Sequence, residues 1–252
     1  MTNTGRFVAI VVGDNPQKLM DNYSNNKVVE PYVLYRFKDR DKLYEKELKV
    51  YEELMKVIKD KSSNNYRMAK EMYDSYKQMG AFDFYNTLIE DNTVDAETGN
   101  IISTKNPDGR YDTANVGQFF SLPLINVEGK EVYSERKGNV DWSRIHLSNP
   151  QAYEFAWDSV MEGKEPKTDV EKQIYSNMKN RVEYFKAYGD RENYVASNTS
   201  FWGYAFVSEK TGWVELEDNL NQFKWVREFY NRFIVHLDDK ELITVYECYR
   251  AQ

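Results

Sequence analysis

The residues best suited to chemistry lie in two short stretches of the chain. Residues 106–120, NPDGRYDTANVGQFF, combine a turn with an arginine, an acid, a glycine and several aromatic rings, and residues 140–146 add VDWSRIH. A guanidinium can hold two phosphate or carboxylate oxygens at once. Together the two stretches predict one pocket for a small anionic ligand. The predicted ligand-binding residues are Asn106, Gly109, Arg110, Tyr111, Asp112, Gly117, Asp141, Trp142, Arg144 and His146.

Each residue type would have its own role in such a pocket. Arg110 would donate from two nitrogens to a phosphate or carboxylate, and Tyr111 and Trp142 would stack on a base. Gly109 and Gly117 would let the backbone approach the ligand closely, since glycine has no side chain. We therefore expect Arg110→Lys and Trp142→Ala to weaken nucleotide binding.

A purely structural interpretation of the same residues stays open. Pro107-Asp108-Gly109 is a typical turn sequence, Arg110 and Asp112 would form a local ion pair, and Phe119 and Phe120 would belong to the core. Under this interpretation Trp142→Ala lowers stability, and no nucleotide binds.

Signals for catalysis are sparse. The only histidines, His146 and His236, lie in no metal-binding spacing such as H-E-x-x-H. Cys248, the single cysteine, alternates with apolar and aromatic neighbours, where thiols are usually buried and inert. We therefore predict neither a metal nor a cofactor. An enzyme acting on a nucleotide or phosphoester stays open only if Asp112, Asp141 and His146 converge.

Composition narrows the range of partners. The formal net charge is −7 and the basic residues are dispersed among acids, which argues against binding to duplex nucleic acid. No stretch is apolar for long enough to predict a membrane span, and the N-terminus lacks the charged region of a secretion signal. The 20 tyrosines and five tryptophans are types enriched in interfaces, so we expect a homo-oligomer.

Hydrophobic periodicity predicts the elements that must position these residues. Continuous apolar runs at 6–12 and 241–249 predict buried strands, and stripes at helical spacing predict helices over about 40–58 and 64–79. Thr168 and Glu171 form a capping box for a helix to about 188. Further predicted elements are a strand at 28–37, a β-hairpin at 200–216 and a helix at 219–237.

The order of these elements predicts an α+β fold. Strand, helix and strand come first, and a hairpin, a helix and a strand come last, which suggests a ferredoxin-like antiparallel sheet core. In that core the first and last strands would pair at the centre. Residues 1–38 and 195–252 would form the α+β core, and residues 39–194 a large, mainly helical insertion with a turn-rich loop region at 91–148.

Several motifs resemble a family of bacteriophage proteins that has no established activity. The resemblance rests on FVAIVVGDN, NNKVVEPY, the NPDGRYD loop, VDW, WGYAFV followed by GWVE, and ITVYECY, and is scattered over nearly the whole chain. Many members have Trp-Asp-Trp and Gly-Gly-Arg-Trp in the loop, where this chain has Tyr111-Asp112-Thr113 and Gly117-Gln118-Phe119-Phe120. A site made of those residues would be altered here.

The resemblance implies a phage origin and hence the host cytoplasm. We expect an accessory binding protein for counter-defence or host takeover, which sequesters a small, nucleotide-like signalling ligand. The alternative is an acidic inhibitor of a host protein, either a defence protein or one that binds nucleic acid, contacted through a tyrosine-rich helical face.

Overall fold

The computed structural model describes residues 5–89, 92–117, 119–145, 150–163, 165–176, 181–217 and 221–250. The chain divides into two compact units. The first combines Met1–Lys27 with Asp108–Gln252, and the second is Val28–Pro107. These boundaries do not coincide with the expected ones at 38/39 and 194/195, and each unit is described by itself.

A six-stranded sheet forms the centre of the first unit. Its strand order is β10-β9-β1-β11-β5, and β8 also pairs with β11. The strands are β1 (Arg6–Val12), β5 (Thr113–Val116), β8 (Ser134–Arg136), β9 (Ala205–Ser208), β10 (Gly212–Glu215) and β11 (Leu242–Tyr249). Strands β1 and β11 pair antiparallel, with Phe7 opposite Cys248 and Val12 opposite Ile243. This pairing confirms the expectation for the first and last strands.

The order of the hairpin strands departs from a ferredoxin-like sheet, in which all neighbouring strands run antiparallel. Here β9, the first hairpin strand, lies beside β1 and runs parallel to it, with Ala9 opposite Ala205. A parallel neighbour requires a long crossover connection, which the segment between β1 and β9 provides. The α+β class with a helical region is confirmed, and the ferredoxin-like core is not.

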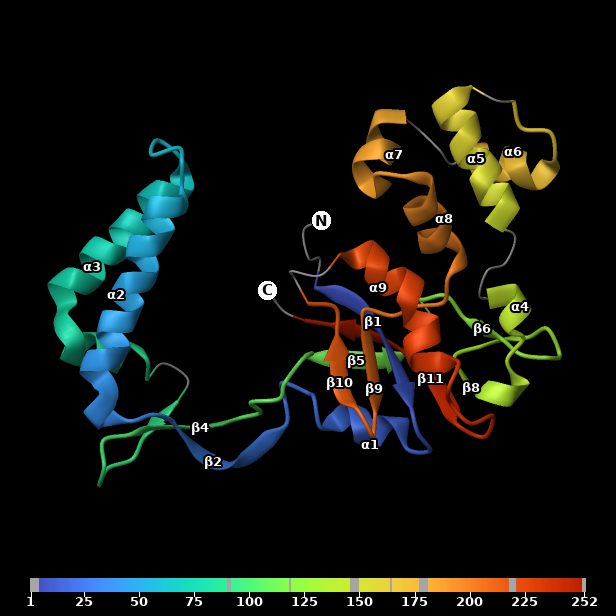
Figure 1. The fold of residues 1–252 in the computed structure, drawn as a ribbon. Helices are drawn as coiled ribbons and strands as arrows, with labels where there is room; N and C mark the ends of the chain where they lie inside the picture. The colour runs from blue at the N-terminus through green and yellow to red at the C-terminus, as the bar shows by residue number, and fades with distance from the viewer. Residues whose placement is uncertain are drawn as a thin grey trace. The chain divides into compact units, whose positions relative to one another are not determined.

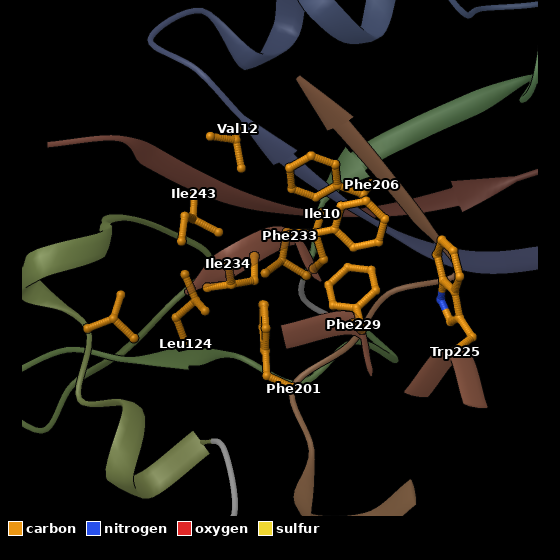
Figure 2. Close-up of a cluster of buried hydrophobic side chains, with 12 residues drawn as sticks. Ile10, Val12, Leu124, Phe201, Phe206, Trp225, Phe229, Phe233, Ile234 and Ile243 are labelled. Atoms are coloured by element: carbon orange, nitrogen blue, oxygen red, sulfur yellow. The ribbon is translucent and has the colours of Figure 1, made fainter. Parts of the chain in front are cut away.

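Helices cover both faces of this sheet (Figure 1). Residues of β1 alternate between two clusters, so Ala9 and Val11 pack with Met20 of α1 (Pro16–Asp21). Ile10 packs on the other face with residues of α9 (Gln222–Phe229) and of the following π-helical turn η3 (Tyr230–Ile234). Figure 2 shows the second cluster, in which Phe206 stacks on Phe233 with centroids 4.5 Å apart. Part of the expected helix, 219–220, lies outside the described residues.

The remaining elements of the first unit are short. They are β6 (Leu124–Ile125), β7 (Glu131–Val132), η2 (Lys137–Asn139), α4 (Trp142–Ile145), α5 (Pro150–Glu162), α6 (Asp169–Ser176), α7 (Arg181–Tyr188) and α8 (Arg191–Thr199). The capping box is confirmed, because Glu171 N–H donates to Thr168 Oγ1 and Thr168 N–H donates to Glu171 Oε2. The helix expected to reach 188 is described as α6 and α7, and residues 177–180 between them lie outside the described residues.

The second unit joins a small sheet to a helical hairpin. The sheet order is β2 (Val28–Tyr35), β4 (Ile101–Lys105) and β3 (Thr93–Val94), and the turn η1 (Phe37–Asp39) leads into α2 (Arg40–Val57) and α3 (Asn64–Thr87). Gly80 has a φ of 79° and kinks α3. The buried Tyr85 hydroxyl accepts from the Ile101 N–H at 3.1 Å, which ties α3 to the sheet. Among the described residues, no helix has the length and apolarity needed to cross a membrane.

Candidate functional site

The first predicted stretch is held against the turn that follows α1. The Arg110 N–H donates to the Tyr23 carbonyl at 2.7 Å, and Asn25 Nδ2 donates to Asp112 Oδ1 at 2.9 Å. The Arg110 guanidinium donates to the carbonyl of Gly109. The backbone of Arg110 and the side chain of Asp112 are therefore both held by this turn.

Tyr111 is part of the core rather than of an open surface. Its ring stacks on Trp213 with centroids 6.3 Å apart and planes at 24°, and it belongs to the cluster that includes Met20. Burial raises the pKa of the Tyr111 phenol. In this structure the ring offers no open face to a base.

The second predicted stretch packs on the α9 side of the sheet. Trp142 contacts Phe201 and Tyr230 edge-on, with centroids 5.4 and 5.2 Å away, and its indole N–H donates to the Lys137 carbonyl. Asp141 Oδ2 pairs with Arg144 Nε at 3.2 Å, and Asp141 Oδ1 accepts from the Ser143 hydroxyl. These contacts hold the start of α4.

The structure does not bring the two stretches into one pocket. Tyr111 belongs to the cluster on the α1 face of the sheet and Trp142 packs on the cluster of the α9 face, so the sheet lies between them. Asn106 lies in the second unit, and His146 lies outside the described residues. Because His146 is outside that range, the enzyme hypothesis stays an expectation from the sequence.

The loop after β5 contains one predicted site residue, Gly117, and its backbone converges on one buried carboxylate. The N–H groups of Phe119, Phe120 and Ser121 and the Ser121 hydroxyl all donate to Glu247 Oε1 at 2.8 Å. Glu247 lies on β11 and is completely buried. We call residues 117 and 119–122 the clamped loop.

The charge of Glu247 is stabilised inside the protein. Burial acts to raise the pKa of its carboxyl, but the hydrogen bonds from Ser121, Phe120 and Phe119 outweigh burial and lower the pKa to about 2. Hydrogen bonds to a charged group are about twice as strong as neutral ones. The carboxylate therefore fixes the backbone of the clamped loop.

Gly117 has a structural reason for being glycine. A β-carbon at this position would lie 2.0 Å from Ser121 Oγ, so any other residue would push apart the two ends of the loop. The Gly117 N–H also donates to the Val245 carbonyl at 2.9 Å. Gly117 therefore supports the turn itself, a role different from the predicted approach to a ligand.

The clamped loop presents large apolar side chains to solvent. Phe119 is 81% exposed and Leu122 is 79% exposed, so the expectation that Phe119 belongs to the core is wrong. Phe120 is only partly covered, edge-on against Tyr249 with centroids 5.8 Å apart. Val116 at the end of β5 is exposed as well.

Two signals in the sequence point to this loop in retrospect. Glu247 is an acid within the apolar run LITVYECY, and a buried acid needs several donors. The run FFSLPL lies between turn-rich segments. Its proline disfavours both a strand and a helix in this run.

A separate concavity in the first unit contains two arginines. It has a volume of about 370 Å³ and is lined by Glu154, Arg191, Glu192, Val195, Ala196, Thr199, Ser200, Arg227 and Asn231. Arg191 is neutralised by Asp158 at 3.0 Å and lies 3.5 Å from Glu154. Arg227 donates instead to the neutral side chain of Asn193, which is buried.

Comparisons of the chain with protein-family models, curated proteins and solved structures give no match. The resemblance to bacteriophage proteins stays an expectation from the sequence motifs.

Proposed function

We propose that the protein acts by binding a partner protein, with the clamped loop as a principal contact. The observation that carries this proposal is the exposure of Phe119 and Leu122 on a backbone that three N–H groups tie to the buried Glu247. Single exposed apolar residues are common on protein surfaces. Several on one short, fixed loop are less common, and exposed apolar patches mark interaction sites.

The clamp gives the loop the property that a binding anchor requires. Ordering a flexible loop on association costs free energy, and a loop already held in one conformation avoids that cost. Aromatic side chains that insert into a partner's pocket dominate many interfaces. Phe119 is such a side chain, Leu122 adds exposed apolar surface to the same loop, and Glu247 provides the rigidity.

The net charge of −7 favours a basic partner, because complementary charge speeds encounter. For a chain that resembles bacteriophage proteins, the proposed partner is a basic host protein, such as a defence or nucleic-acid-binding protein. Counter-defence or host takeover is then the proposed role.

Site-specific photocrosslinking in bacterial cells tests the proposal. A photoreactive amino acid replaces Phe119, and a matched control carries it at Phe185 on α7, which is 61% exposed. We expect one discrete adduct with a protein from position 119 that is absent from position 185. Adding Leu122→Ser should reduce that adduct. Equal adducts from both positions, or none from position 119, would contradict the proposal.

A second candidate function is sequestration of a small anionic ligand. It is favoured by Arg227, whose charge is held at the 370 Å³ concavity by the neutral side chain of Asn193. Calorimetry against a panel of linear and cyclic nucleotides tests it. Binding that falls at least tenfold in Arg227→Gln, but not in Arg110→Lys, would support it. No heat from any member of the panel would exclude nucleotides as the ligand.

A further inference from the structure

The helical hairpin of the second unit has very little core of its own. No residue of α2 is buried, although the helix is 18 residues long. The half-buried side of α2 faces α3, where Tyr51 contacts Tyr76 with centroids 5.8 Å apart and Tyr44 contacts Phe84 at 5.9 Å. Helices in proteins derive most of their stability from packing, and this one packs along a single stripe.

Each helix carries a second apolar stripe that the described residues of the second unit leave largely exposed. On α2 it consists of Val50, Leu54 and Val57, and on α3 of Met68 and Met72. These side chains are between 39% and 75% exposed. The spacings of four and three residues keep each stripe on one side of its helix.

A hydrogen bond shows that the two stripes lie on the same side of the hairpin. The Tyr73 hydroxyl donates to Glu52 Oε1 at 2.8 Å, so these two residues mark one side. At about 100° per residue, Val50 and Leu54 lie about 200° around α2 from Glu52. Met72 and Met68 lie about 100° and 140° around α3 from Tyr73. Both stripes therefore point away from the side of the Tyr73–Glu52 bond and form one apolar face.

The charge of the hairpin suits association with a second copy. Residues 40–87 contain ten Lys and Arg and nine Asp and Glu, which gives a net charge of +1. The other residues carry a net charge of −8, and the whole chain therefore has −7. Two hairpins can therefore meet without net repulsion. A hairpin so close to neutral offers little attraction to a strongly acidic or basic partner.

The dimensions of this apolar face also suit a dimer interface. At 1.5 Å per residue α2 is about 27 Å long, and two helices side by side are about 20 Å wide. The area of this face is of the same order as the roughly 800 Å² per partner that stable interfaces bury.

We propose that two copies of the chain associate through this face of α2 and α3, which forms a four-helix bundle around a two-fold axis. Such a contact is self-complementary, as closed dimers require. The bundle core would consist of the second stripes, and the first stripes would stay between α2 and α3 of each copy.

Molar mass in solution tests the proposal. We expect the full chain at tens of micromolar to have about twice its 29.9 kDa. Val50→Lys with Leu54→Lys should give 29.9 kDa, because two charges would be buried in the bundle. Phe185→Lys, a change at an exposed apolar residue of the first unit, should leave the dimer intact. A monomeric wild type, or a dimer that persists in the double variant, would overturn the proposal.

A spin label provides a second readout that does not depend on whether the double lysine variant folds. Cys248 is buried and burial raises the pKa of its thiol to about 12, so an engineered cysteine is labelled selectively. A label at Met68→Cys should be immobilised, and a label at Glu45→Cys on the other side of the hairpin should move freely. Equal mobility at both positions would count against the bundle.

Discussion

Glu247 is the residue on which the candidate site depends. A carboxylate that accepts four hydrogen bonds at 2.8 Å can hold three successive backbone groups in one arrangement. Its function as a clamp needs the charge as well as the shape. Substitutions that keep the shape and remove the charge therefore separate the two contributions.

We expect Glu247→Gln to destabilise the protein by about 3 kcal/mol at neutral pH, because charge-assisted hydrogen bonds are lost in a buried position. The folded pKa of about 2 lies below the ordinary value of 4.5. The carboxylate therefore stabilises the fold above pH 4.5, and this contribution is lost as the pH falls from 4.5 towards 2. Urea denaturation over this range should show a steeper pH dependence in the wild type than in the Gln variant. Equal pH dependence in both proteins would rule out the clamp as its source.

Trp142 provides a test of the predicted nucleotide pocket at the scale of single residues. It packs against Phe201 and Tyr230, so we expect Trp142→Ala to lower the free energy of unfolding by about 3 kcal/mol. Arg110→Lys should change stability by less than about 0.5 kcal/mol, since the structure uses the backbone of Arg110 more than its guanidinium. Chemical denaturation of both variants measures the difference. A Trp142→Ala variant as stable as the wild type would contradict this structural role and favour the predicted nucleotide pocket.

At the scale of elements, the end of β5 and the kink of α3 each depend on a glycine. The two glycines differ in the physical reason for their presence. Gly117 is tightly enclosed by Ser121, whereas Gly80 has no atom within 4 Å of a built β-carbon but has a φ of 79°. Steric contact governs the first position and backbone conformation governs the second.

We expect Gly117→Ala to destabilise more than Gly80→Ala. A β-carbon 2.0 Å from Ser121 Oγ must displace the clamped loop, whereas an alanine at positive φ costs about 1–2 kcal/mol. Thermal melts rank the two variants. Adding Ser121→Ala to Gly117→Ala should recover little stability, because the same change removes a donor to Glu247. A Gly80→Ala variant that is less stable than Gly117→Ala would show that the kink of α3 matters more than the loop.

At the scale of the whole molecule, the central strand β11 connects the core to the candidate site. Its residues pair with β1 and β5 and pack on both faces, and Glu247 and Cys248 are adjacent on it. Exposure of Cys248 requires that the sheet of the first unit opens. The thiol therefore reports on global rather than local unfolding of that unit.

We expect Cys248 to react with a thiol reagent only through this opening, since burial raises its pKa to about 12. In native conditions its reaction rate should follow the unfolding equilibrium measured with urea. Leu122→Ser, which changes an exposed side chain of the loop, should leave the rate unchanged, whereas Glu247→Gln should increase it. Rapid labelling of the native protein would show that β11 opens locally.

The sequence by itself determined the elements whose residues interact over short distances. The capping box at Thr168 and Glu171, the first stripe of α2 and the apolar strands β1 and β11 follow from spacing, because caps and periodicity act within a few residues. The α+β class followed from their order. The pairing of the first and last strands was predicted from the same order.

Only the tertiary structure decided where these elements and loops lie. Periodicity shows that a strand has two faces but not which loop covers each, so it did not reveal that Tyr111 and Trp142 lie on opposite faces. The parallel pairing of β9 with β1 and the contact of Glu247 with the loop at 119–121 join residues more than a hundred positions apart. Such contacts depend on how the whole chain closes on itself, and no local pattern encodes them. For the same reason Phe119 looked like a core residue, until the fold showed that nothing in the described chain covers more than a small part of it.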